Sequence, residues 1–168
     1  MQRTPFAEMA CSIARTLDAA GEPWSPLIVR DVFVGITRFE DLRKDLGISR
    51  KVLTDRLQAL VDQTILERRP YSEHPPRHEY ALTPKGLEFC EIIFAMVAWG
   101  DRWTAGAAGP PALLRHTTCG NLTHAVVSCS CCGERLTPDE VVAEAGPGGL
   151  RGFGTEVMAQ RLAGAPEA

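Results

Sequence analysis

The turn at residues 47–49 (GIS) joins two helical patterns and constrains the fold more than any other stretch of this 168-residue sequence. Before the turn, Thr37 and Glu40 have the spacing of a capping box, so we expect the threonine to cap a short helix that ends at Gly47. After the turn, Ser49 is a good N-cap for a helix with apolar residues at three- and four-residue intervals. These apolar residues are Val52, Leu53, Leu57, Leu60 and Val61. Two helices joined in this way form a helix-turn-helix.

Two amphipathic segments precede this unit. The spacing of apolar residues predicts helices over residues 7–20 and 23–35, because each places its apolar side chains on one stripe. A glycine ends each of them, at Gly21 and Gly35.

The segments after residue 62 change from helical to strand-like periodicity. Residues 65–69 and 78–83 read as two strands, and residues 70–77 contain too much proline for a ladder and are expected to form the turn. Thr83 and Pro84 then open a long helix, with the threonine as N-cap and the proline in the first turn. A helix-turn-helix followed by a hairpin is a winged helix, so the expected fold class is mainly α with a small β-hairpin wing.

A winged helix presents its second helix to base edges in the major groove, while the hairpin reaches the adjacent backbone or minor groove. The net charge of −3 means that such binding would depend on a local arrangement of basic residues and not on bulk charge. Basic and polar side chains do gather off the apolar stripe and around the hairpin. The residues predicted to contact DNA are Arg38, Ser49, Arg50, Lys51, Thr54, Arg56, Arg68, Arg69 and Arg77.

Five stretches within roughly residues 8–100 resemble the HxlR family of bacterial winged helix-turn-helix regulators, a MarR-like group. The stretches are residues 11–18 (CSIARTLD), 23–31 (PWSPLIVRD), 38–42 (RFEDL), 47–57 (GISRKVLTDRL) and 77–86 (RHEYALTPKG). The resemblance implies a homodimeric transcription factor that is held together by the first and last helices of the domain. We therefore expect a sequence-specific DNA-binding transcriptional regulator, a repressor, that binds a palindromic operator and responds to a small-molecule effector or a redox signal.

The long helix supports a homodimer independently of the resemblance. Phe94, Met96, Val97 and Trp99 give this helix more apolar surface than one small domain is expected to cover. In a dimer, two recognition helices about 34–36 Å apart would read half-sites one DNA turn apart.

A repeated pattern near the C-terminus predicts a metal site. His116 and Cys119 are separated by two residues and followed by a glycine, and Cys129 and Cys132 repeat this arrangement. Two ligands at this spacing reach an ion from one tight turn, and the glycine can take the positive φ that turns backbone amides toward the sulfurs. We expect these four residues to bind one structural Zn²⁺ per chain in a zinc-ribbon-like β-hairpin module.

Other assignments of these residues stay open. His124 could replace His116, and Cys131 could replace a neighbouring cysteine. The cysteines could also respond to oxidants directly, and Cys131 is then the redox-sensing candidate. A second candidate is Cys11, which has the cationic Arg15 one turn further along and could equally be a small core residue.

Composition and punctuation divide the chain into four parts. We expect a winged-helix DNA-binding and dimerisation domain at residues 1–104, a linker at 105–111, the zinc-ribbon-like module at 112–145 and a flexible Gly/Ala-rich tail at 146–168. The longest apolar run, residues 92–99, is far shorter than the ~20 residues of a membrane span. A cytoplasmic protein without membrane contact is therefore expected.

Two other classes of function compete with DNA binding. Outside the cysteines, no nucleophile has a base and an orienting group at a recognisable spacing, so we do not expect an enzyme. The main alternative is a winged-helix protein-interaction module, in which the same helix and wing bind protein and the zinc-ribbon-like module docks a partner.

Overall fold

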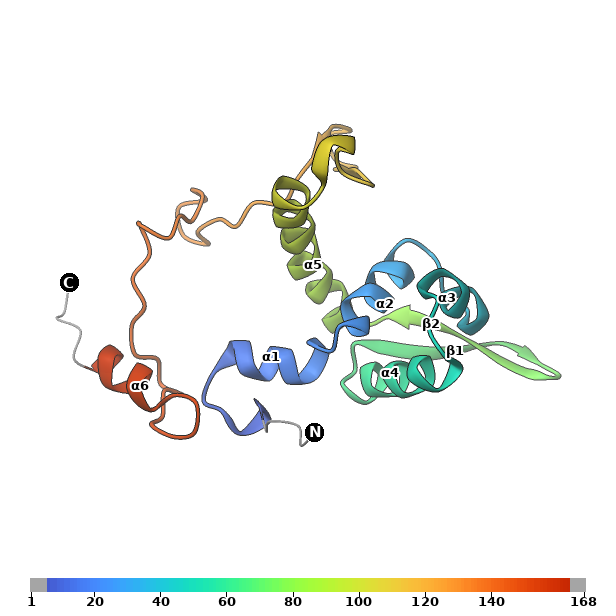
Figure 1. The fold of residues 1–168 in the computed structure, drawn as a ribbon, viewed down its shortest axis with the longest axis horizontal. Helices are drawn as coiled ribbons and strands as arrows, with labels where there is room; N and C mark the ends of the chain where they lie inside the picture. Colours follow the sequence, from blue (N-terminus) through green and yellow to red (C-terminus); the bar gives the residue numbers. More distant parts are fainter. Residues whose placement is uncertain (1–5, 164–168) are drawn as a thin grey trace.

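The computed structural model describes residues 6–163, in which a winged-helix domain is followed by a projecting helix and two small hairpins (Figure 1). In chain order the elements are η1 (Phe6–Glu8), α1 (Ser12–Ala20), α2 (Trp24–Phe33), α3 (Phe39–Leu46), α4 (Arg50–Asp62), β1 (Leu66–Glu73), β2 (Pro76–Leu82), α5 (Pro84–Trp103), η2 (Gly106–Ala108), β3 (Leu114–Arg115), β4 (Leu122–Thr123) and α6 (Glu156–Ala163). Among these described residues, no helix is both long and apolar enough to cross a membrane. The predicted fold class, mainly α with a β-hairpin wing, is confirmed.

The hydrophobic core lies where α2, α3, α4 and the base of the hairpin meet. Ile28 and Val29 of α2, Leu42 of α3 and Leu53 and Leu60 of α4 are fully buried there. Each helix buries one face because these side chains recur at helical spacing. Since each such side chain contributes about 1.5–3 kcal/mol on burial, the shared core fixes how α3 and α4 are oriented.

The turn between α3 and α4 follows the sequence prediction. Gly47 ends α3 with φ 65°, a left-handed conformation that is accessible to glycine without a Cβ clash. The Ser49 hydroxyl accepts a hydrogen bond from the Val52 amide at 3.3 Å and so caps α4. Ile48 between them is buried and anchors the turn to the core. The helix-turn-helix is therefore confirmed.

The capping box predicted for α3 is wrong. The N-cap residue is Arg38, and its side chain makes no capping hydrogen bond. The Thr37 hydroxyl instead donates to Glu79 Oε2 at 3.4 Å, and the Thr37 carbonyl accepts from the Tyr80 amide at 2.9 Å. Residues 37–38 thus pair with β2, and this long-range pairing replaces the local cap.

The wing is longer than predicted. Strands β1 and β2 pair antiparallel along their whole lengths, and the register shifts between Pro70 and Ser72. The prediction ended the first strand at residue 69 and began the second at residue 78, because proline cannot donate to a ladder. In a two-stranded hairpin both strands are edges, so proline fits at outward-facing positions and near a bulge.

The first predicted helix begins later than expected. A short η1 precedes it, and Cys11 occupies the N-cap position of α1 with extended backbone (φ −141°, ψ 119°), so the prediction of one helix from residue 7 is wrong. Met9, which lies in the break, packs against the C-terminal segment: a Cβ added to Gly154 would lie only 2.7 Å from the Met9 side chain. The break accommodates this contact between chain segments far apart in sequence.

Helix α5 leaves the domain after its first half. Cys90 and Ile93 are buried, and Phe33 of α2 packs edge-on against Phe94 with ring centroids 5.1 Å apart. Beyond this contact α5 projects away from the other helices of the domain (Figure 1). Its second half therefore extends beyond the core.

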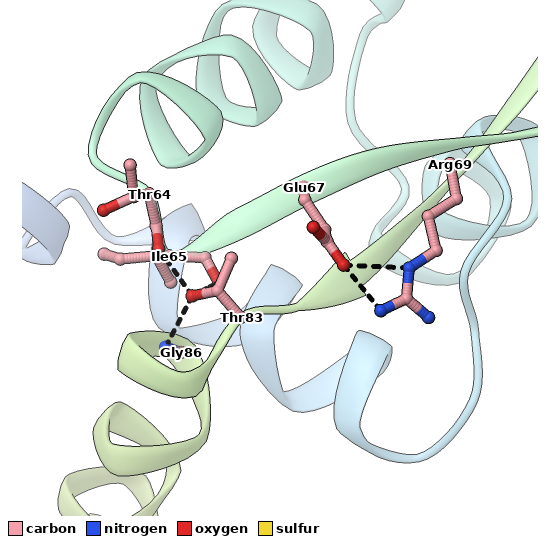
Figure 2. Close-up of polar contacts among 6 residues, drawn as sticks. All are labelled: Thr64, Ile65, Glu67, Arg69, Thr83 and Gly86. Carbon is pink, nitrogen blue, oxygen red and sulfur yellow. Dashed lines mark hydrogen bonds and ion pairs between the residues drawn. The ribbon is translucent and has the colours of Figure 1, made fainter.

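The start of α5 is bonded to the connection between α4 and β1 (Figure 2). The Thr83 hydroxyl donates to the Thr64 carbonyl at 2.5 Å and accepts from the Gly86 amide at 3.1 Å, and the Thr83 amide donates to the Ile65 carbonyl at 3.2 Å. A Cβ on Gly86 would lie 2.2 Å from the Ile65 carbonyl oxygen, so only glycine fits this contact. The predicted Thr83 cap is confirmed and also ties α5 to the helix-turn-helix.

The C-terminal segment contains more regular structure than predicted. A flexible tail was expected from residue 146, whereas α6 occupies Glu156–Ala163. Thr155 before this helix is buried, and its hydroxyl donates to the Leu150 carbonyl at 2.9 Å. This local bond and the Met9–Gly154 contact both lie just before α6, and the flexibility of the tail stays a prediction. The last part of the predicted tail, residues 164–168, lies outside the described residues.

Replacing Gly86 with alanine should destabilise the protein by about 1–3 kcal/mol, because the new Cβ overlaps a backbone oxygen that cannot move alone. Gly100→Ala is the matched control on the same helix: its nearest neighbour is 3.7 Å away, so removing a helical glycine there should stabilise by about 0.5–1 kcal/mol. Chemical denaturation measures both. Equal effects of the two substitutions would contradict the close approach at Gly86.

Candidate nucleic-acid interface

Helix α4 divides into a buried stripe and an exposed face. Leu53, Leu57 and Leu60 are buried, whereas Arg50, Lys51 and Thr54 are exposed. The exposed side chains lie in the first half of the helix, directly after the turn. This is the end of a recognition helix that contacts base edges in helix-turn-helix proteins.

Arg50 is held by residues of α3. Its guanidinium forms an ion pair with Glu40 and lies 5.1 Å from the centre of the Phe39 ring. Glu40 also accepts a hydrogen bond from Arg43 at 3.0 Å, and the Arg43 guanidinium, together with that of Arg50, lowers the pKa of the Glu40 carboxyl. All three charged groups are substantially exposed, so solvent screens these pairs and Glu40 holds Arg50 only weakly.

Lys51 and Ser49 also have intramolecular partners. Lys51 pairs with Asp55 one turn further along, with Nζ and Oδ2 3.0 Å apart and both side chains exposed. Ser49 is exposed but uses its hydroxyl to cap α4. The acidic partners Glu40 and Asp55 were absent from the predicted site, although their spacing of three and four residues from Arg43 and Lys51 is the signal that indicates such helix pairs.

Arg56 lies apart from this exposed face. It is only one quarter exposed, on the other flank of the buried stripe, and its Nη1 is 3.3 Å from Glu22 Oε1. This ion pair links α4 to the connection between α1 and α2. The structure therefore brings Arg50, Lys51 and Thr54 together and separates Arg56 from them.

Four of the predicted DNA contacts lie on or beside the wing. The Arg38 guanidinium stacks over the Tyr71 ring at 4.5 Å, and Arg69 donates from Nε to Glu67 Oε1 at 2.8 Å (Figure 2). Arg68 and Arg77 are exposed on β1 and β2. Tyr71 had no sequence signal as a site residue, because its stacking on Arg38 depends on the pairing of residue 38 with β2.

The cysteines fall into three environments. Cys90 is buried, and burial raises the pKa of its thiol, which fits a core role. Cys11 is half-buried at the start of α1. Cys119, Cys131 and Cys132 are exposed and Cys129 is half-buried in the hairpins after α5, where the backbone amides of Cys132 and Cys131 lower the pKa of Cys129.

The predicted metal ligands occur as two pairs. His116 and Cys119 lie in the turn between β3 and β4, and Cys129 and Cys132 lie in the following turn. Within residues 6–163, no group of three or more His, Cys, Asp or Glu side chains is placed to hold one metal ion.

Comparison with known proteins supports the interpretation of the domain. The family model for the HxlR-like helix-turn-helix matches residues 19–107, which includes α3, α4, the wing and α5. An HTH-type transcriptional regulator of Mycobacterium tuberculosis, Rv3095, is 42% identical over 137 residues, covering 82% of this chain and 87% of the relative. A match of 137 residues within this 168-residue chain starts at residue 32 at the latest and ends at residue 137 at the earliest. The matched region therefore spans both cysteine-containing turns.

Solved structures show the same architecture. The crystal structure of the transcription factor PA1607 superimposes with a TM-score of 0.74 at 30% identity and covers 84% of this chain and 99% of its own. The redox regulator HypR in its oxidized form has a TM-score of 0.51 at 31% identity over 55% of this chain and 96% of its own. The winged-helix domain is thus shared with transcription regulators, one of which is named for redox control.

Proposed function

This chain belongs to the HxlR-like helix-turn-helix family and is a transcriptional regulator of helix-turn-helix type, and we propose that it binds operator DNA as a homodimer. Helix α4 would enter the major groove, and the β1–β2 wing would contact the adjacent backbone. We further propose that the bound protein acts as a repressor.

The observation that carries this proposal is the exposed basic start of α4 beside the wing. Arg50 and Lys51 are positioned by an N-capped turn, and Figure 1 shows that α3, α4 and the hairpin lie at the same end of the molecule. Their partners, Glu40 and Asp55, are exposed carboxylates on the same surface. The intramolecular pairs keep the basic side chains oriented before DNA binds. On binding, DNA phosphates would replace these carboxylates, and counterions would be released.

A second copy of the chain would cover α5 and α1. The projecting part of α5 exposes a continuous apolar face, and α1 exposes further apolar side chains. The exposed residues are Ile13, Leu17, Leu87, Ile92, Met96, Trp99 and Trp103. Trp99 is 64% exposed and Trp103 is 67% exposed, values that indicate an interaction surface when such residues are contiguous. A two-fold dimer through this face would present two copies of α4 to one palindromic site.

We propose that the regulatory signal, a small molecule or an oxidant, also acts on α1 and α5. Residues of α1 and α5 line an open groove of about 820 Å³ that includes Arg15, Phe89 and Ile92. Cys11 lies at the start of α1, so either a small-molecule effector in the groove or oxidation of this thiol would act on the helices proposed to form the dimer. The structural likeness to the redox regulator HypR supports the second route.

Replacing Arg50 and Lys51 with alanine should weaken binding to a DNA fragment from upstream of the protein's own coding sequence. The slope of log K against log salt concentration should become less negative by about 0.9 for each phosphate that the variant no longer neutralises. Fluorescence anisotropy over a salt series measures affinity and slope together.

Arg56→Gln is the control for this experiment, because it removes one charge from the same helix outside the exposed face. It should leave the slope unchanged. If the double variant keeps the wild-type affinity and slope, the assigned face is wrong. If the wild type binds no duplex DNA, the protein-interaction alternative replaces DNA binding.

The dimer has its own test. The wild type should have twice the chain mass of 18.3 kDa in sedimentation equilibrium, and Trp99→Glu should shift it to monomer, because the variant introduces a charge into the apolar face of α5. Val142→Glu, at an apolar residue that is 78% exposed outside this face, should remain dimeric. A monomeric wild type would refute the proposed assembly.

A further inference from the structure

The segment after α5 contains two turns with the same backbone hydrogen bonds. In the first, the Gly120 amide donates to the His116 carbonyl at 2.8 Å, and the His116 amide donates to the Asn121 carbonyl at 2.9 Å. Strands β3 and β4 flank this turn and pair antiparallel. The turn is therefore the tip of a short hairpin.

The second turn repeats this pattern. The Gly133 amide donates to the Cys129 carbonyl at 2.8 Å, and the Cys129 amide donates to the Glu134 carbonyl at 2.7 Å. An antiparallel bridge between Ser128 and Arg135 closes its base. The two turns thus place their residues in equivalent positions.

The predicted metal ligands occupy matching positions in the two turns. His116 corresponds to Cys129 and Cys119 corresponds to Cys132, and each pair is followed by a glycine with positive φ, 74° at Gly120 and 77° at Gly133. The Cys131 amide donates to the Cys129 sulfur at 3.4 Å. The turn therefore directs a backbone amide toward the sulfur of one predicted ligand.

The side-chain distance within the first turn fits a shared ion. His116 Nδ1 and Cys119 Sγ are 3.5 Å apart. With Zn–S of about 2.3 Å and Zn–N of about 2.0–2.1 Å, nitrogen and sulfur ligands of one tetrahedral zinc ion are about 3.6 Å apart. The first turn therefore already has the spacing that a common ion requires.

The segment has no hydrophobic core of its own. No residue between 105 and 154 is buried, and the apolar Leu122, Val126 and Val127 are more than half exposed. A module of this size without apolar burial needs another source of folding free energy, and structural zinc supplies it by holding both turns. Nine residues lie between Cys119 and Cys129, so at roughly 3.3–3.6 Å per residue the connecting chain is long enough for both turns to reach one ion.

We propose that His116, Cys119, Cys129 and Cys132 bind one structural zinc ion that joins the two hairpins into a closed module at the end of α5. Binding of Zn²⁺ displaces the thiol protons of the three cysteines to solvent, and no electron transfer is involved. His124 lies between the two hairpins, and Cys131 corresponds to Thr118 in the first turn, so both side chains stay outside the coordination sphere. Four protein ligands leave no open position for water, so the ion has a structural role.

The test uses the full chain expressed in zinc-supplemented medium and purified under reducing conditions. Mass spectrometry of metal content should give one zinc per chain, with two reactive thiols, Cys11 and Cys131, before denaturation. Replacement of the bound zinc by Co²⁺ should give the absorption spectrum of a tetrahedral thiolate site. Cys119→Ser, Cys129→Ser, Cys132→Ser and His116→Ala should each abolish the one-to-one zinc content and change the cobalt spectrum.

The matched controls are His124→Ala and Cys131→Ser, which should retain one zinc and the wild-type cobalt spectrum. The proposal is overturned if the wild type holds no zinc and takes up no cobalt, or if His124→Ala loses the metal while His116→Ala keeps it. Chelation should increase proteolysis within residues 112–145 and leave residues 12–103 protected. Equal protection of both regions with and without metal would also overturn it, and this result is independent of DNA binding.

Discussion

The contact between Thr83 and the α4–β1 connection is the interaction on which the rest of the structure depends. One hydroxyl bonds to the Thr64 carbonyl and caps α5, so the helix proposed for dimerisation is fixed to the end of the helix proposed for DNA binding. Thr64 itself has φ 55°, a left-handed conformation that costs a non-glycine residue about 1–2 kcal/mol. Gly86 permits the close approach that holds this strained residue in place. The same contact therefore connects α5 to the base of the wing and to the end of α4.

Intramolecular contacts restrict the orientation of the basic side chains in the candidate interface. Arg50 and Lys51 are each paired with a nearby carboxylate, and Arg38 is stacked on Tyr71. Exposed pairs of this kind contribute little to stability, typically about 0.2–1 kcal/mol, so their main effect is to restrict side-chain orientation. The negative overall charge of the chain would also disfavour non-specific association with DNA. In the proposed complex, affinity would depend on DNA phosphates and base edges that take the places of the Glu40 and Asp55 carboxylates.

The sequence correctly predicted the turns and helix caps that depend only on residues close together in the chain. The Gly47 turn, the Ser49 cap and the Thr83 cap follow from backbone preferences of one or two residues, and all three are present. The prediction failed where distant segments meet: Thr37 pairs with β2, Met9 packs on Gly154, and Pro70 is accommodated by an edge strand. For the interface, helical periodicity predicted that Arg50, Lys51 and Thr54 share a face, but it could not reveal that Arg56 pairs with Glu22 or that Tyr71 meets Arg38. In the cysteine segment, the repeated spacing predicted two turns, and the proposal of His116 rather than His124 as a ligand is argued from the matching hydrogen bonds of these turns.

The most direct test of the central claim is a hydroxyl-radical footprint of the full-length protein on its own upstream DNA. A homodimer that places α4 of each protomer in the major groove should protect two segments related by two-fold symmetry, with centres about 10–10.5 base pairs apart or a multiple of that spacing. Protection of a single segment, or of segments without two-fold symmetry, would contradict the account.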